Sequence, residues 1–86
     1  MNYNKIKEEL ENLGYLSYIR KNLKDKYVFS GVPDELTLMK PNYSFNIFIV
    51  DDKIILNYFI GQLLKSDKFS TVKELIDFIK VEFPIK

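Results

Sequence analysis

The sequence contains no cysteine, no histidine, no tryptophan and no alanine, and its single arginine is Arg20. Without cysteine there is no disulfide framework, no thiolate metal site and no thiol nucleophile. Without histidine, the serine–histidine triad and imidazole acid–base chemistry are excluded as well. Glycine-rich phosphate loops, EF-hand loops and zinc-ligand spacings do not occur. We therefore expect a protein that is not an enzyme, has no catalytic residues and holds no cofactor or metal.

The acidic residues do not suggest a catalytic site either. Six of the twelve occur as neighbouring pairs, Glu8-Glu9, Asp34-Glu35 and Asp51-Asp52. Adjacent side chains point in opposite directions on a strand and diverge on a helix. The pairs are therefore expected to lie on solvated faces and turns, and Asp51-Asp52 has the composition of a tight turn.

Length and composition predict one small soluble domain. The 86 residues include 13 Lys or Arg and 12 Asp or Glu, for a net charge of +1, and 47% are hydrophobic. No segment resembles a signal peptide or is long enough to span a membrane, so we expect residues 1–86 to form a single cytoplasmic domain. The preference for Lys, Asn and Ile and the absence of Ala indicate the AT-rich codons of a low-GC genome.

Two segments have the periodicity of amphipathic helices. The first begins after Asn2 or Asn4 as the N-cap, ends at Gly14, and has its apolar residues at Tyr3, Ile6, Leu10 and Leu13. The second is predicted over about residues 71–81, where Thr71 and Glu74 form a capping box and Pro84 follows the pattern. A helix is thus expected near each end of the chain.

Between the helices the period changes to two, which predicts strands. Residues 43–50 and 53–60 form a β-hairpin with Asp51-Asp52 as its turn, and shorter strands are predicted over 27–30 and 36–40. Residues 15–23 fit a helix or a strand, and we favour a strand that begins the sheet. The fold class is therefore α+β: a two-layer sandwich whose antiparallel sheet of about four strands has both helices packed on one face.

The central hairpin has two faces of different character. Residues equidistant from the turn lie opposite each other, so one face carries Ile49–Ile54, Ile47–Leu56, Phe45–Tyr58 and Tyr43–Ile60 and is apolar throughout. This face is predicted to lie beneath the helices. The other face carries Val50–Lys53, Phe48–Ile55, Asn46–Asn57 and Ser44–Phe59 and is only partly polar.

That second face is the first candidate interaction surface. Three explanations for its apolar residues remain open: a cover formed by the loops or by residues 61–69, a homodimer, or a different partner protein. If no segment of the chain covers it, the protein interface comprises Phe48, Val50, Ile55, Phe59, Asp51 and Asp52.

A basic, aromatic segment is the second candidate surface. Arg20, Lys21, Lys24 and Lys26 occur within seven residues, beside Tyr18 and Tyr27. Cations interleaved with aromatic rings are typical of single-strand nucleic-acid platforms, and they also suit an acidic protein. The near-zero net charge and the single arginine favour a simpler interpretation, in which the segment is a solvated hairpin turn.

These patterns lead to one functional hypothesis and three alternatives. The hypothesis is a non-enzymatic protein-binding module. By analogy of size and architecture, it would be a phage or mobile-element inhibitor of a host protein complex, such as an anti-CRISPR or another anti-defence inhibitor. The alternatives are a toxin-immunity protein, a nucleic-acid-binding protein that uses residues 20–26, and a self-associating structural subunit.

Overall fold

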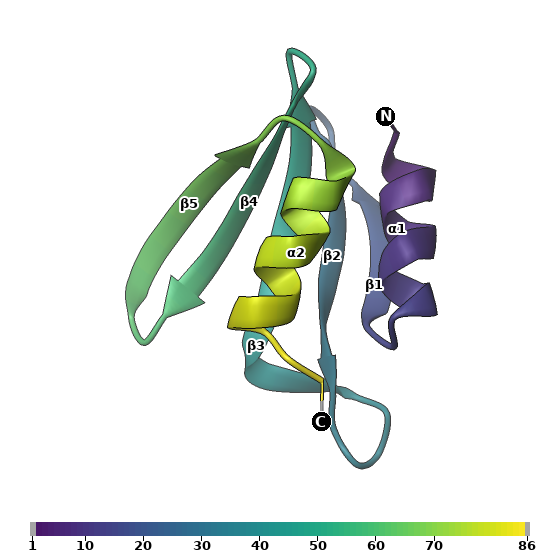
Figure 1. The fold of residues 1–86 in the computed structure, drawn as a ribbon, viewed down its shortest axis with the longest axis vertical. Coiled ribbons are helices and arrows are strands. Elements are labelled where there is room, and N and C mark those ends of the chain that lie inside the picture. The colour runs from purple at the N-terminus through teal and green to yellow at the C-terminus, as the bar shows by residue number, and fades with distance from the viewer. Residues whose placement is uncertain (1, 86) are drawn as a thin grey trace.

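The computed structural model describes residues 2–85 as a five-stranded antiparallel meander with one helix at each end of the chain (Figure 1). The elements are, in order, α1 (Tyr3–Asn12), β1 (Leu16–Lys21), β2 (Lys26–Pro33), β3 (Met39–Val50), β4 (Lys53–Ile60), β5 (Leu63–Phe69) and α2 (Val72–Glu82). The strands are ordered β1-β2-β3-β4-β5, so each strand pairs with its neighbour in sequence. Both helices lie on the same side of the sheet (Figure 1), which confirms the predicted α+β sandwich.

The helices begin and end where the sequence predicts. The Asn2 side chain accepts a hydrogen bond from the Lys5 N–H, and Gly14 has a φ of 102°, the left-handed conformation that ends a helix. At α2, the Thr71 hydroxyl accepts a bond from the Glu74 N–H at 3.1 Å and donates one to the Glu74 carboxylate at 3.0 Å. Each cap satisfies a backbone donor that the first helical turn leaves unpaired.

Three predictions about the strands are confirmed and one is wrong. The strand predicted over 27–30 lies within β2. Residues 16–21 form β1, as favoured for the ambiguous segment, and the 43–50 and 53–60 strands pair as a hairpin. Residues 36–38 are not a strand but part of a loop, and only Met39 and Lys40 belong to β3. The reason is local: the Asp34 carboxylate accepts bonds from the backbone N–H groups of Leu36 and Leu38, which therefore do not join the sheet.

Residues 61–69, considered as a cover for the sheet, instead extend it. Gly61 has a φ of 62° and begins a two-residue turn with Gln62, which leads directly into β5 along the edge of β4. A glycine in this position is typical of type II′ hairpin turns. The sheet consequently has five strands rather than about four, and this segment does not lie over either face.

The core lies between the helices and the predicted apolar face of the hairpin. Ile47, Ile54 and Leu56 are fully buried, and the pairs Ile49–Ile54, Ile47–Leu56 and Phe45–Tyr58 have the predicted register. The helices contribute the fully buried side chains of Ile6, Leu10, Leu75 and Ile79. Beyond Phe45, the side chains of Tyr43 and Ile60 are about half exposed, so the buried face is shorter than predicted.

Two tyrosines connect distant elements within this core. The Tyr15 hydroxyl donates to the Phe83 carbonyl at 2.6 Å, which attaches the start of β1 to the end of α2. Burial raises the pKa of Tyr15. Tyr58 donates to the Asp67 carboxylate at 2.6 Å, and burial together with this hydrogen bond raises its pKa to about 12.

Candidate binding surface

The surface that both helices leave open is the opposite side of the sheet, here called the outer face. Side chains alternate along each strand, and directly paired residues share a side. Because Ile47 and Leu56 are buried beneath the helices, their neighbours Phe48 and Ile55 point away from them. The register extends this side across all five strands, to Leu16, Tyr18, Arg20, Tyr27, Phe29, Ser44, Asn46, Phe48, Val50, Lys53, Ile55, Asn57, Phe59, Leu64, Ser66 and Lys68.

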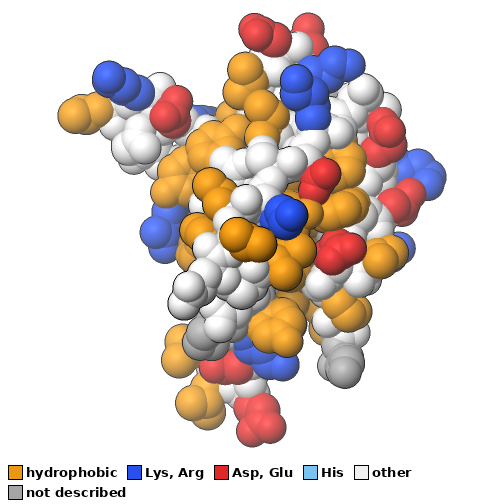
Figure 2. All heavy atoms as spheres, turned by 90° about the vertical axis from the view of Figure 1, so that its left-hand side faces the viewer, with side chains coloured by type: hydrophobic (Ala, Val, Ile, Leu, Met, Phe, Trp, Pro, Cys, Tyr) orange, Lys and Arg blue, Asp and Glu red, His pale blue; other side chains and the backbone are white. Residues whose placement is uncertain are grey.

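Aromatic and aliphatic side chains occupy much of the outer face. Phe59 is 55% exposed and Leu64, directly opposite it on β5, is 63% exposed. Figure 2, which looks onto the β5 edge of the sheet, shows hydrophobic side chains exposed among charged ones. Five strands about 4.8 Å apart and about six residues long give a face of about 400 Å². Exposed apolar side chains gathered on one face of a small protein often mark an interaction site.

Two contacts restrict side chains on this face: one between two rings and one between Arg20 and a ring. Tyr27 and Phe48 stack with their centroids 5.2 Å apart and their planes inclined by 30°. Arg20 lies over the Phe29 ring, with its guanidinium carbon 4.4 Å from the centroid. Such contacts restrict the side chains before a partner binds, which lowers the entropy cost of association.

The charges of the outer face have one sign. Arg20, Lys53 and Lys68 project from β1, β4 and β5, and the paired outer-face positions described by the structure include no Asp or Glu. The protein as a whole has a net charge of only +1. The paired positions of the outer face thus carry a charge of +3, against +1 for the whole protein, and this local excess favours partners with exposed carboxylates or phosphates.

The candidate interface predicted from the hairpin lies on this face and at its end. Phe48 and Ile55 are half-buried, whereas Val50 and Phe59 are exposed. Asp51 and Asp52 form the turn at the tip of the hairpin, with φ values of 50° and 63° that match a type I′ turn. The two aspartates thus border the outer face instead of lying on it.

The basic segment, in contrast, is divided between the two sides of the sheet. Arg20, Tyr18 and Tyr27 belong to the outer face. Lys21 and Lys26 are paired and point to the helix side, where the Lys26 ammonium lies 5.7 Å from the Tyr3 ring centroid. Lys24 is exposed in the turn, where the Asn22 side chain accepts bonds from the N–H groups of residues 24 and 25.

Nine outer-face residues were in neither predicted set, although four of them had been placed on this face of the hairpin: Ser44, Asn46, Lys53 and Asn57. The other five are Leu16, Phe29, Leu64, Ser66 and Lys68. Phe29 follows from the alternation of Tyr27 with Val28, once β2 is paired with β1. Leu64 and Lys68 depend on residues 63–69 being a strand, and the low β-propensity of Lys, Ser and Asp in this segment gave no such signal.

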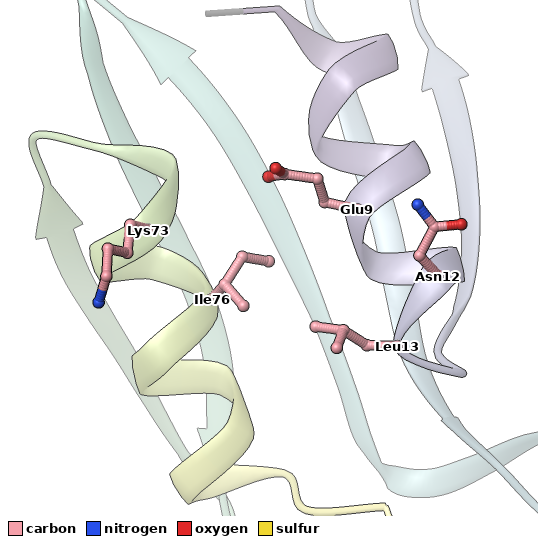
Figure 3. A pocket seen from close by; sticks show the side chains of 5 residues that line it. All are labelled: Glu9, Asn12, Leu13, Lys73 and Ile76. Atoms are coloured by element: carbon pink, nitrogen blue, oxygen red, sulfur yellow. The ribbon is translucent and has the colours of Figure 1, made fainter.

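A groove between α1 and α2 is the other hollow of interest (Figure 3). Its volume is about 320 Å³, and Leu13 and Ile76 point toward each other across it. Lys73 points away from the groove, and its ammonium forms an ion pair with Asp77 at 2.7 Å. Ligand sites combine an apolar lining with convergent polar groups. The groove has an apolar lining, but its polar side chains do not converge on one point. The outer face is therefore the better candidate for a binding site.

Three further findings concern known kinds of site and known proteins. No three His, Cys, Asp or Glu side chains within residues 2–85 come together as metal ligands. No helix in this part of the chain combines the length and apolarity needed to cross a bilayer. Comparison with protein families, with curated proteins and with solved structures gives no match.

Proposed function

We propose that the protein is a non-enzymatic binding module that holds a partner protein against the outer face of its sheet. The observation that carries this proposal is the aromatic outer face, which both helices leave open because they pack on the other side of the sheet. An antiparallel sheet with one face in water ordinarily alternates apolar with polar residues. Here that face retains Tyr18, Phe48 and Phe59 where polar residues would be expected.

The chemistry of the face indicates the kind of partner. Aromatic side chains and arginine are the residues in which binding energy is concentrated at protein interfaces. Tyr18 and Arg20 on β1 and Phe59 on β4 provide these groups. The other cations of this face, Lys53 and Lys68, favour a partner surface that combines apolar side chains with carboxylates. In this proposal the protein acts as an inhibitor by occupying that surface, as a small phage or mobile-element protein would, and an immunity protein would act in the same way.

Single-stranded nucleic acid is a second candidate, because the aromatic rings and cations share one face. Bases stack on exposed aromatic rings, and cations follow the phosphates. Against it, Lys21 and Lys26 point to the other side of the sheet, which leaves Arg20, Lys53 and Lys68 as the only cations at the paired outer-face positions that the structure describes. A protein partner therefore remains the first proposal.

The decisive experiment compares two single variants that remove an exposed apolar side chain from opposite sides of the molecule. Phe59→Ser alters the outer face, and Val81→Ser alters α2, where Val81 is 76% exposed. Each tagged variant is used to capture proteins from a nuclease-treated bacterial lysate, and the affinity of any captured protein is then measured with purified components. We expect Phe59→Ser to weaken binding at least tenfold and Val81→Ser to leave it unchanged.

Two results would contradict the proposal. One is a captured protein that binds Phe59→Ser as tightly as the unaltered chain, because its site would then lie elsewhere. The other is tight binding of a labelled single-stranded oligonucleotide that weakens steeply with salt and is lost in Phe59→Ser and Arg20→Ala. That outcome would establish the nucleic-acid alternative in place of a protein partner.

A further inference from the structure

The free edge of β5 forms one end of the sheet and is exposed along most of its length. β5 pairs with β4 on one side, and no strand of residues 2–85 lies along its other side. Its residues are exposed except for Asp67 and Phe69, which are partly buried. Such an edge presents unpaired backbone N–H and C=O groups that are able to accept another strand.

The turn before β5 determines which backbone groups face outward. Ile60 and Leu63 flank the two-residue turn, so they form a hydrogen-bonded pair. Hydrogen-bonded and non-hydrogen-bonded pairs alternate along an antiparallel ladder. Leu64, Ser66 and Lys68 therefore direct their N–H and C=O groups away from β4, toward the free edge.

The order of side chains along β5 makes the strand complementary to a second, antiparallel copy of itself. On the helix side of the sheet the strand carries, in sequence, Leu63, Lys65, Asp67 and Phe69: apolar, positive, negative, apolar. A two-fold axis through Ser66, perpendicular to the sheet, places Lys65 of one copy opposite Asp67 of the other. The same axis places Leu63 opposite Phe69. Every pair on this side is then either of opposite charge or apolar.

Neighbouring registers lack this complementarity. Moving the axis by one residue, to Lys65 or to Asp67, places two lysines or two aspartates directly opposite each other, which is destabilising. With the axis at Ser66, the Lys65–Asp67 pairs occupy non-hydrogen-bonded positions, where opposite side chains are closest. The other edge strand, β1, carries Arg20 and Lys21 and no acidic residue, so its self-pairing gains no attraction between opposite charges.

We propose that two copies of this chain pair through β5, antiparallel and two-fold symmetric about Ser66, to form a continuous ten-stranded sheet. A two-fold contact of this kind uses the same patch on both subunits, which is the commonest arrangement among homodimers. The two outer faces then lie side by side on one surface. The inference rests on the backbone and charges of β5, and it holds whichever partner the outer face binds.

Charge exchange tests this register directly. Lys65→Asp places acidic side chains opposite Asp67 at both symmetric positions, and we expect the dimer dissociation constant, measured by analytical ultracentrifugation at low salt, to rise at least tenfold. The double variant Lys65→Asp/Asp67→Lys restores opposite charges and should return the constant to within about threefold of the original. Lys24→Asp makes the same change of charge in the β1–β2 turn and should have no effect.

A backbone variant provides an independent arm if the double variant folds poorly without the Tyr58–Asp67 hydrogen bond. Ser66→Pro removes the N–H at the centre of the predicted contact, and proline is accepted on an edge strand when its missing N–H faces outward. This variant should fold, as judged by circular dichroism, and remain monomeric. A chain that is monomeric at millimolar concentration would overturn the proposal, and so would a dimer unaffected by both Lys65→Asp and Ser66→Pro.

Discussion

The strongest test of the two-sided sheet is a pair of substitutions that differ in which side of the sheet they alter. Ile47, on β3, is fully buried beneath the helices, whereas Phe59, on β4, is 55% exposed on the outer face. Ile47→Asp introduces a carboxyl group into the core, and Phe59→Ser removes a ring from the surface. If the assignment of faces is right, Phe59, although it is the larger side chain, contributes less to folding than Ile47.

The magnitudes are well separated. A domain of 86 residues has a free energy of unfolding of about 4 to 13 kcal/mol. Ile47→Asp loses the packing of a buried side chain, about 2 to 5 kcal/mol, and adds several kcal/mol for an unpaired buried carboxyl group, so we expect an unfolded chain. Phe59 buries less than half of its surface, so its removal should cost about 1 kcal/mol.

Urea denaturation followed by far-ultraviolet circular dichroism measures both effects. The unaltered protein and Phe59→Ser should give cooperative transitions with similar slopes and midpoints that differ slightly, while Ile47→Asp should show no folded baseline. Phe48→Ser should fall between them at about 2 kcal/mol, because Phe48 is half-buried and stacks on Tyr27. If Phe59→Ser lost more than about 3 kcal/mol, the outer face would be core and the reasoning refuted.

Three further predictions concern single contacts. The raised pKa of Tyr58, about 12, means that the folded state favours its protonated phenol, so this stabilisation is complete below pH 10 and lost between pH 10 and 12. Between pH 10 and 12, the free energy of unfolding measured with urea should fall by about 1 to 2 kcal/mol more in the unaltered protein than in Tyr58→Phe, since solvent screens the phenol oxygen in part. Equal decreases in the two proteins would contradict this prediction. Tyr15→Phe leaves the Phe83 carbonyl without its hydrogen bond and should lower the free energy of unfolding by about 1 to 2 kcal/mol. An unchanged urea midpoint would contradict this prediction. Thr71→Ala removes the α2 cap and should lower the free energy of unfolding by about 1 kcal/mol, whereas Thr71→Ser should retain most of it.

Most of the fold could be predicted because its signals are local. Helix caps at Asn2 and Thr71, the left-handed Gly14 and the turn at Asp51-Asp52 each depend on a few adjacent residues, and the structure confirms all of them. The pairing of β3 with β4 then followed from alternation about the turn, as the register shows.

The parts that sequence reasoning missed depend on contacts between distant residues or on unusual local bonding. Residues 36–38 have the composition of a strand, but the Asp34 side chain holds their backbone N–H groups in a loop. β5 is rich in charged residues and becomes a strand because β4 offers it an edge. Arg20 and Phe59 lie on the same face because of the registers of three successive strand pairs, β1–β2, β2–β3 and β3–β4. The sequence alone did not determine these three registers.

The open outer face follows from the number of helices relative to the number of strands. Two helices of 10 and 11 residues are enough to cover one side of a five-stranded sheet, and both are used there. Covering the second side would need further elements, because every strand connection in this meander is a turn or loop between neighbouring strands. Selection for stability alone would place polar residues on that side, as antiparallel sheets with one wet face usually do. Tyr18, Phe48 and Phe59 depart from that pattern on three different strands, and they do so together with Arg20, Lys53 and Lys68. Exposed rings and cations of one sign contribute little to folding. Their contribution to binding is therefore the informative quantity, and the affinities of Phe59→Ser and Val81→Ser measure it.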